Sequence, residues 1–228
     1  MKTSTFMGLL GLGLAVIGGA LYYQERKRSG LMGRYTPGKF AEAPVIDSYS
    51  DGETTTTLRA SNNMTVEERI GSIQKMIEKS VMDPQMRKLA MQITAGCPER
   101  DGRCEAKAIY KWVKKNVRYT GDVAPIKMST GDVEGIDLYQ SARKTIEYGG
   151  GDCDDQVGVV GTLASVIGLT TRLRVTSEEP GGEPSHIYGV VGLPKFDPSS
   201  WIAVDTTLPG SYNFGVEGGS GEVTDFDA

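Results

Sequence analysis

The chain has 228 residues, enough for one domain of ordinary size with extensions at its ends. Hydrophobic residues make up 39% of it and charged residues 24%, which is typical of a globular protein and argues against intrinsic disorder. The formal net charge is −4 and no basic block stands out in the body of the chain, so we expect no nucleic acid partner.

Residues 6–23 form an uncharged stretch near the N-terminus. As a helix this stretch would be roughly 27 Å long, just enough to cross the hydrocarbon core of a bilayer. Tyr22 and Tyr23 end it and cations follow at 26–28, which is how a spanning helix meets the membrane interface. Small residues recur at a spacing of four on one face, which would let two such helices associate closely. These residues are Gly11, Ala15 and Gly19.

A secretory signal peptide is the competing interpretation of residues 1–28. Lys2 would supply the positive start, residues 9–20 the apolar core, and residues 18–20 the small-residue cleavage site. The cations that follow favour a retained anchor and, by the positive-inside tendency, a domain on the cytoplasmic side. We expect a single-pass protein of a cell envelope or viral membrane, with residues 29–63 as a Gly-, Pro-, Ser- and Thr-rich linker.

Three helices are predicted after the linker. Thr65 and Glu68 have the spacing of a capping box, and apolar residues recur at helical spacing behind them. Asp83 and Pro84 offer a second helix start. A third helix is predicted over residues 104–117, and its lysines are expected to form a solvated face.

The three cysteines cannot build a disulfide framework in a chain of this length. Cys97 and Cys104 flank a short turn-like loop, so they either form a bridge in an oxidising compartment or remain as two reduced thiols. Cys153 is left over, and an unpaired cysteine in a chain with a distant histidine is a candidate nucleophile.

The second half of the chain predicts a buried helix followed by strands. A short helix over 141–148 is broken by glycines at 149–151, and residues 153–168 are apolar on most sides, which indicates a buried helix. Three strand-like stretches follow, at 171–176, 186–193 and 201–206. We therefore predict an α+β domain over residues 64–208, with residues 209–228 as an acidic, Gly-rich tail that is bound to the surface or mobile.

Cys153 lies where chemistry favours an ionised thiol. Glycines before it let the chain turn sharply and let a substrate backbone approach. In the first turn of a helix, the helix dipole and the N–H groups favour the thiolate and can receive an oxyanion.

His186 is the only histidine, so it has no rival as the base for this thiol. It begins one predicted strand, and Asp205 ends the next, where a lone carboxylate would be costly without a partner. If the two strands are neighbours, Asp205 can orient one imidazole nitrogen while the other faces Cys153.

These segments resemble the transglutaminase-like superfamily, whose members share a papain-like cysteine-protease core. Residues 150–155 are similar to its nucleophile motif, residues 185–188 to its histidine strand, and residues 201–207 to its Trp…Asp-Pro-Thr strand. Thr206 stands where proline is common in that strand. Residues 108–119 are similar to the helix that precedes the core.

The resemblance covers roughly residues 64–207 and implies the roles of the site residues. Cys153 would be the nucleophile, His186 the general base and then acid, and Asp205 the orienting carboxylate. Gln140 would add an oxyanion donor, as a glutamine does in papain-like enzymes. The fold implied is a papain/transglutaminase-like core, in which the buried nucleophile-bearing helix packs on a small antiparallel sheet after several helices and an N-terminal transmembrane helix.

The expected function is a membrane-tethered cysteine hydrolase, a peptidase or amidase, that acts on a protein or peptide through a thioester. The alternatives are a cross-linking transglutaminase with an amine acceptor, and a structural or binding component of a cell envelope or membrane-containing virion. We expect no cofactor. We also expect no metal, because one histidine and scattered carboxylates give no ligand spacing.

Overall fold

The structure of the protein is a computed structural model. It describes the residues 57–60, 65–120, 137–177, 182, 184–210, 213–219 and 221–228. All of them belong to one compact unit that spans residues 44–228. No helix in this described part of the chain is long and apolar enough to cross a membrane, and the predicted membrane segment, residues 6–23, lies outside it.

The first three helices of the described chain form close to where the sequence predicts them. They are α2 (Val66–Val81), α3 (Pro84–Thr94) and α4 (Gly102–Asn116). The predicted capping box is confirmed, because Thr65 N donates to Glu68 Oε2 over 2.8 Å and Glu68 N donates to Thr65 Oγ1 over 3.3 Å. The Asp83 side chain caps α3 by accepting from Gln85 N over 2.9 Å.

The glycines after the short helix α5 (Ala142–Tyr148) bring the chain into the central helix. Gly149 ends α5 with a left-handed φ of 66°, which glycine adopts without strain. β4 (Gly150–Gly151) then pairs in parallel with β2 (Arg118–Tyr119). A Cβ atom at Gly150 would lie only 2.7 Å from Thr120 Cγ2, so the close approach of these two segments requires glycine.

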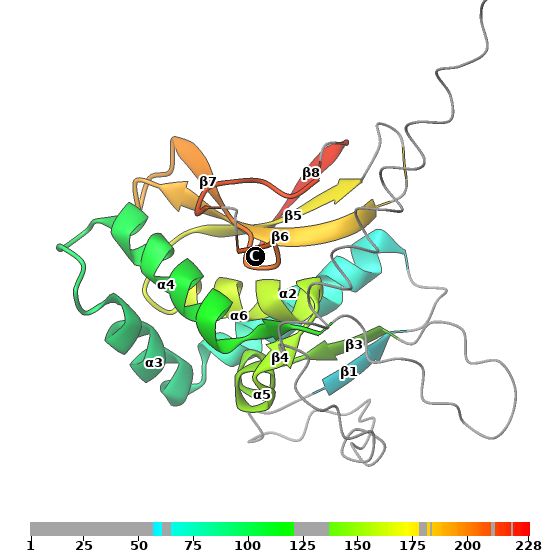
Figure 1. Ribbon diagram of the computed structural model, residues 1–228, viewed down its shortest axis with the longest axis horizontal. Helices are drawn as coiled ribbons and strands as arrows, with labels where there is room; N and C mark the ends of the chain where they lie inside the picture. Colours follow the sequence, from blue (N-terminus) through cyan, green and yellow to red (C-terminus); the bar gives the residue numbers. More distant parts are fainter. Residues whose placement is uncertain are drawn as a thin grey trace, which may run out of the picture. The chain divides into compact units, whose positions relative to one another are not determined.

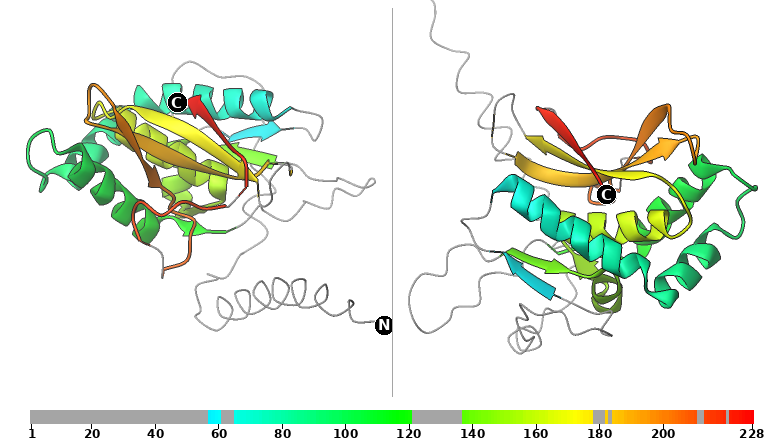
Figure 2. Two further views of the ribbon diagram at one scale, coloured as in Figure 1. Left: turned by 90° about the horizontal axis from the view of Figure 1, so that it is seen from above. Right: turned by 180° about the vertical axis from the view of Figure 1, so that it is seen from behind.

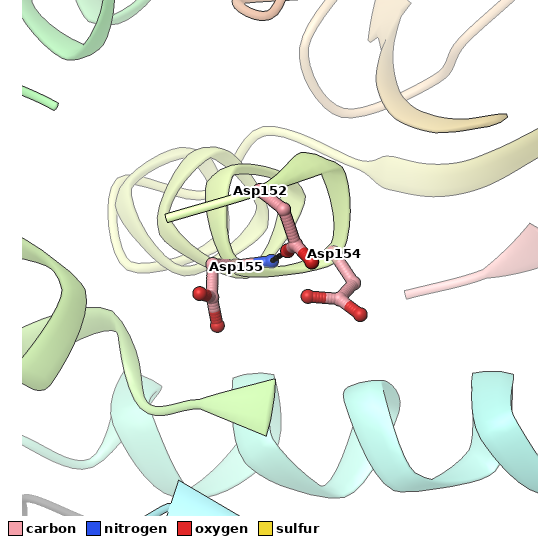
Figure 3. Close-up of side chains that lie close together, drawn as sticks. All are labelled: Asp152, Asp154 and Asp155. Carbon is pink, nitrogen blue, oxygen red and sulfur yellow. Dashed lines mark hydrogen bonds between the residues drawn. The ribbon is translucent and has the colours of Figure 1, made fainter. Parts of the chain in front are cut away.

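Helix α6 (Cys153–Ser165) is the buried centre of the domain. It lies beneath the main sheet and packs against α2, α4 and α5 on its other sides (Figure 1). Its later residues fill the two main hydrophobic clusters, among them Val157, Val160 and Leu163. Its first turn differs, because it carries two aspartates, Asp154 and Asp155, and a third, Asp152, is the N-cap (Figure 3).

The main sheet is antiparallel and has the order β7-β6-β5-β8 (Figure 2). Its strands are β5 (Thr171–Ser177), β6 (Pro184–Leu193), β7 (Ser200–Val204) and β8 (Val223–Asp227). The first three confirm the predicted strands. A Cβ atom at Gly189 of β6 would lie 3.1 Å from Val160 Cγ1, so this glycine lets the sheet settle closely onto α6.

Strands also form in two segments that the sequence places outside the domain. β8 lies in the predicted tail and pairs with β5 along its length. β1 (Thr57–Ala60) lies in the predicted linker and pairs in antiparallel fashion with β3 (Asp137–Gln140). Both predicted boundaries therefore leave out residues that pair with the core elements.

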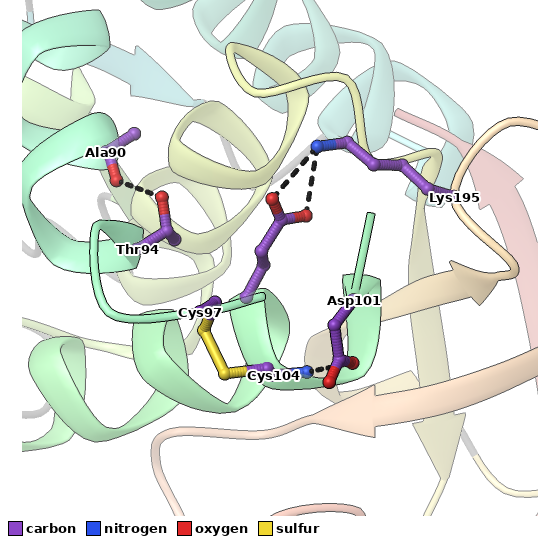
Figure 4. The surroundings of a disulfide bond; sticks show 7 residues. Ala90, Thr94, Cys97, Asp101, Cys104 and Lys195 are labelled. Atoms are coloured by element: carbon purple, nitrogen blue, oxygen red, sulfur yellow. Dashed lines mark hydrogen bonds and ion pairs between the residues drawn. A yellow bond between two sulfur atoms is a disulfide. The ribbon is translucent and has the colours of Figure 1, made fainter. Parts of the chain in front are cut away.

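A disulfide joins Cys97 to Cys104 across the turn between α3 and α4, with the two Cα atoms 5.6 Å apart (Figure 4). Of the two states that the sequence left open, a bridge or two reduced thiols, the structure therefore has the bridge. Next to the bridge, Lys195 Nζ donates to both carboxylate oxygens of Glu105, over 3.1 and 3.0 Å. This ion pair connects the start of α4 to the loop that follows β6.

We predict that the double substitution Cys97→Ser/Cys104→Ser lowers the free energy of unfolding by about 2 kcal/mol, because the bridge restricts the unfolded chain. Urea unfolding under non-reducing conditions measures the change. Cys153→Ser is the control and is expected to leave the stability near that of the parent. A parent protein whose stability does not respond to a reducing agent would contradict the prediction.

Candidate functional site

His186 and Asp205 meet at one end of the main sheet. His186 lies near the start of β6, and Asp205 follows β7 directly. The imidazole Nε2 is 2.8 Å from Asp205 Oδ2. The other oxygen of Asp205 accepts from Thr207 N over 3.0 Å and from Thr207 Oγ1 over 2.7 Å. The structure therefore brings together the two residues that the sequence predicts as base and orienting carboxylate, and we call them the His–Asp pair.

The surroundings of Asp205 keep its carboxylate ionised. The residue is only 1% exposed, and this burial by itself would raise its pKa. The hydrogen bonds and charge from His186 and the hydrogen bonds from Thr207 outweigh burial, so the pKa of Asp205 lies below its ordinary value. A buried carboxylate in this state fixes Nε2 of His186 as a donor and leaves Nδ1 as the imidazole's other functional atom.

The turn after Asp205 is held by α4. Lys114 Nζ donates to the carbonyl oxygens of Leu208 and Pro209, over 2.6 and 3.2 Å. Burial lowers the pKa of Lys114, and the charge of Asp205 opposes this shift. The prediction of a solvated lysine face on this helix is therefore wrong at Lys114, because these carbonyls draw its ammonium group inward.

Cys153 is the first residue of α6 and lies outside any disulfide. It is half-buried and packs against the hydrophobic cluster that contains Val157 of the same helix and Ile187, the neighbour of His186. The N-cap of the helix is Asp152, whose side chain accepts from Asp155 N over 3.3 Å. The thiol is thus placed in the first turn of a buried helix, next to the strand that carries His186.

Gln156 links the helix of Cys153 to the strand of Asp205. Its Oε1 accepts from Thr206 Oγ1 over 2.7 Å, and its Nε2 donates to Gly151 O over 3.3 Å. Gln156 is only 1% exposed, so both contacts are made away from solvent. The Thr206 hydroxyl, which the proline common at this place lacks, therefore contributes to the site. Sequence reasoning missed this bond. A glutamine among the apolar residues of a buried helix indicates that some polar partner exists, but not which residue supplies it.

Gln140, the predicted oxyanion donor, is bonded to Asp155. The Gln140 backbone N and side-chain Nε2 donate to Asp155 Oδ1 and Oδ2, over 2.7 and 2.5 Å. Burial and the neighbouring charge of Asp152 raise the pKa of Asp155 well above its ordinary value, and the bonds from Gln140 only partly oppose this shift. The oxyanion role of Gln140 stays a prediction, with one of its side-chain N–H bonds committed to Asp155.

Asp152, Asp154 and Asp155 form the one acidic cluster in the described part of the chain with the spacing of metal ligands (Figure 3). One oxygen of each lies within 4.8 Å of the others. Asp152 already caps the helix, and both oxygens of Asp155 accept from Gln140. The positive end of the α6 dipole also opposes a bound cation. We therefore assign this cluster to the capping of α6.

Comparisons with known proteins place this chain in a known superfamily. The model of the transglutaminase-like superfamily matches residues 87–206, more than half of the chain. No curated protein matches the sequence. The solved structures similar to this one include a candidate cysteine protease from Cytophaga hutchinsonii, at 16% identity and a TM-score of 0.39. A protein described as a TGase has 17% identity and a TM-score of 0.36.

A candidate protease from Parabacteroides distasonis is also similar, at 11% identity and a TM-score of 0.40. These alignments cover 69%, 67% and 61% of this chain, in the order given. They cover only 54%, 36% and 29% of the other three chains, so this chain spans about half of their length or less.

We predict that Thr206→Val lowers the free energy of unfolding by about 1–3 kcal/mol, because it leaves the buried Gln156 Oε1 without its donor. Urea unfolding measures the effect. Thr162→Val is a matched control, since this buried hydroxyl on α6 has no hydrogen-bond partner in the described structure. The control is expected to be neutral or slightly stabilising, and an equal loss in both variants would refute the role given to Thr206.

Proposed function

Since this chain belongs to the transglutaminase-like superfamily, we propose that it is a cysteine hydrolase, a peptidase or amidase, that acts through a thioester on Cys153. The observation that carries the proposal is the 2.8 Å contact between His186 Nε2 and the buried Asp205 carboxylate. This contact leaves Nδ1 of the imidazole as the group that would serve the thiol. The proposed catalytic residues are therefore Cys153, His186 and Asp205.

The proposed acylation begins with proton transfer. Nδ1 of His186 accepts the Cys153 proton, and the resulting thiolate attacks the carbonyl carbon of the substrate amide. The carbonyl oxygen becomes an oxyanion, which N–H groups in the first turn of α6 would receive. The imidazolium then donates its proton to the leaving amine, the C–N bond breaks, and a thioester on Cys153 remains.

The second half reverses these roles. Nδ1 takes a proton from water, the hydroxide attacks the thioester, and the C–S bond breaks to release the acid. The imidazolium then returns its proton to the Cys153 sulfur, which restores the thiol. An amine in place of water would give a new amide, which is the transglutaminase outcome. The residues of the site serve both acceptors in the same way. We propose water because the sequence resembles small microbial members of the superfamily that look like peptidases.

Gln140 enters the proposal as a second oxyanion donor. A side-chain amide carries two N–H bonds, and only one is engaged with Asp155. The bond to Asp155 would also hold the Gln140 side chain in one orientation, which lowers the cost of using it during the reaction.

We propose that the domain faces an oxidising compartment, with residues 6–23 as its membrane segment. The disulfide between Cys97 and Cys104 supports this side, because such bridges persist where thiols are not kept reduced. It opposes the cytoplasmic orientation that the cations at 26–28 favour.

The compartment is tested by counting thiols in cells that express the full chain and are lysed in a thiol-blocking reagent. We expect one blocked thiol, Cys153, and two more labelled only after reduction and a second reagent. Cys97→Ser/Cys104→Ser is the control and should show no second labelling. Three thiols blocked in the first step would place the domain in a reducing compartment.

We predict that Cys153→Ala abolishes both labelling by a thiol-directed probe and turnover of amide substrates, by at least about a thousandfold. His186→Ala is expected to slow alkylation of Cys153 at neutral pH by roughly 10²-fold or more. The substrate panel contains peptidoglycan stem peptides and protein substrates, each with and without a primary amine. Cys97→Ser/Cys104→Ser is the matched control and keeps the probe reaction at Cys153.

Product masses decide between the outcomes. A free acid whose yield is unchanged by amine supports the hydrolase, whereas an amide that incorporates the amine supports the transferase. A Cys153 that reacts no faster than a small-molecule thiol, and is indifferent to His186→Ala, would instead favour the structural or binding role.

A further inference from the structure

A short loop between β7 and β8, residues 217–219, lies directly against the His–Asp pair. It lies beyond residue 206, where the match to the superfamily model ends, in the predicted tail. Gly218 in this segment is buried. A Cβ atom added to Gly218 would lie 2.8 Å from both Nε2 and Cδ2 of His186 and would overlap Asp205 Oδ2. The backbone at Gly218 therefore lies against the two atoms that share the hydrogen bond. We call residues 217–219 the cover loop.

A charged side chain of β5 holds the start of the cover loop and the strand that follows it. Arg174 on β5 donates from Nη1 to Glu217 Oε1 over 2.7 Å. The same guanidinium binds Asp225 of β8 with two bonds, from Nε over 2.7 Å and from Nη2 over 2.8 Å. These bonds lower the pKa of Asp225, so its carboxylate is ionised at neutral pH and the clamp is charged. Arg174 thus fixes the residue before Gly218 and the strand after it.

Neighbours of His186 complete the attachment. Tyr188, whose ring centroid lies 5.5 Å from that of His186, donates to Glu217 Oε2 over 3.4 Å. Thr176 Oγ1 donates to the carbonyl oxygen of Gly218 over 3.3 Å. The cover loop is therefore bound to strands β5 and β6 and not only to its own chain neighbours.

We propose that Gly218 is a positioning residue whose backbone seals the His186–Asp205 hydrogen bond from water and so holds the imidazole with Nδ1 directed toward Cys153. The catalytic meaning of this role rests on the function proposed above. A hydrogen bond to a carboxylate is stronger where water cannot compete for it, which gives the cover its physical effect. Only glycine fits, because any side chain would occupy the space of the bond itself.

Gly218→Ala tests this proposal without a backbone penalty, since the left-handed conformation in this loop falls at Gly219 (φ 84°) and not at Gly218. Gly210→Ala is the matched control, because a Cβ atom there has no neighbour within 4 Å. Circular dichroism and urea unfolding establish that each variant is folded. The readout is exchange of the His186 Nε2–H proton with water, followed by NMR on ¹⁵N-histidine-labelled protein, in which His186 is the only signal.

In Gly218→Ala we expect this proton to exchange at least tenfold faster than in the parent, and alkylation of Cys153 at neutral pH to slow by about tenfold. Glu217→Gln, which weakens the clamp without filling the covered space, should change both rates in the same direction by a few fold. If Gly218→Ala fails to fold, Glu217→Gln tests the proposal on its own. Gly210→Ala should match the parent.

Unchanged proton exchange in the folded Gly218→Ala and in Glu217→Gln would overturn the proposal that Gly218 seals the His186–Asp205 hydrogen bond. The proposed function can fail separately from it. If exchange accelerates in these variants while His186→Ala leaves the alkylation of Cys153 unaffected, the sealing role of Gly218 is supported and the catalytic role of the His–Asp pair is refuted.

Discussion

The burial of α6 is the constraint on which the rest of the described structure depends. Its apolar residues pack under the sheet on one side and against helices on the others, so the helix has little freedom to shift. The polar first turn is carried into the interior with it. Each polar group there must find a partner or cost about 1–3 kcal/mol. The bonds of Asp155 to Gln140 and of Gln156 to Thr206 meet this demand. The same bonds tie the start of α6, which Cys153 begins, to β3 and to the segment that follows β7.

The sheet imposes a matching constraint on the His–Asp pair. The pair Gly189–Val204 is the last one between β6 and β7, and Asp205 follows it directly. His186, three residues before Gly189, contacts Asp205 from a diagonal position across the two chains. A carboxylate at that place is buried, and it remains ionised only because His186 and Thr207 donate to it. The pair thus depends on strand register in the way that Cys153 depends on helix packing.

Local signals explain why much of this arrangement can be predicted from the sequence. A capping box, the apolar periodicity of α6 and three strand-like stretches each lie within a few adjacent residues. A single histidine then leaves one candidate base. The contacts that sequence reasoning missed join segments far apart in the chain. β8 is acidic and Gly-flanked, and it pairs with the distant strand β5, on which Arg172 and Arg174 bind Asp227 and Asp225. The link between Thr206 and Gln156 is equally invisible to local patterns.

Three aspartates flank Cys153 in the chain and a fourth, Asp205, binds the proposed base, so it must be explained how this negative charge is tolerated. Burial and the charge of Asp152 raise the pKa of Asp155 well above its ordinary value, so this residue carries less negative charge than an exposed aspartate would. The pKa of Asp205 is shifted the other way. Its contribution to stability is therefore present at neutral pH and lost only as the pH falls through the lowered value. The contribution of Asp155 to stability changes with pH in the opposite direction, because its protonation on acidification relieves a cost to the folded state.

Between these two pKa values, one carboxyl is neutral beside the first turn of α6 and the other is ionised beside His186. The positive end of the helix dipole then stabilises the charge of Asp152 at the N-cap, while Asp205 acts on the imidazole. Environments that push the pKa values of similar groups apart are how one site assigns different roles to them. In this protein the division follows from packing, because the buried helix dictates the partners of Asp155 and the sheet dictates those of Asp205.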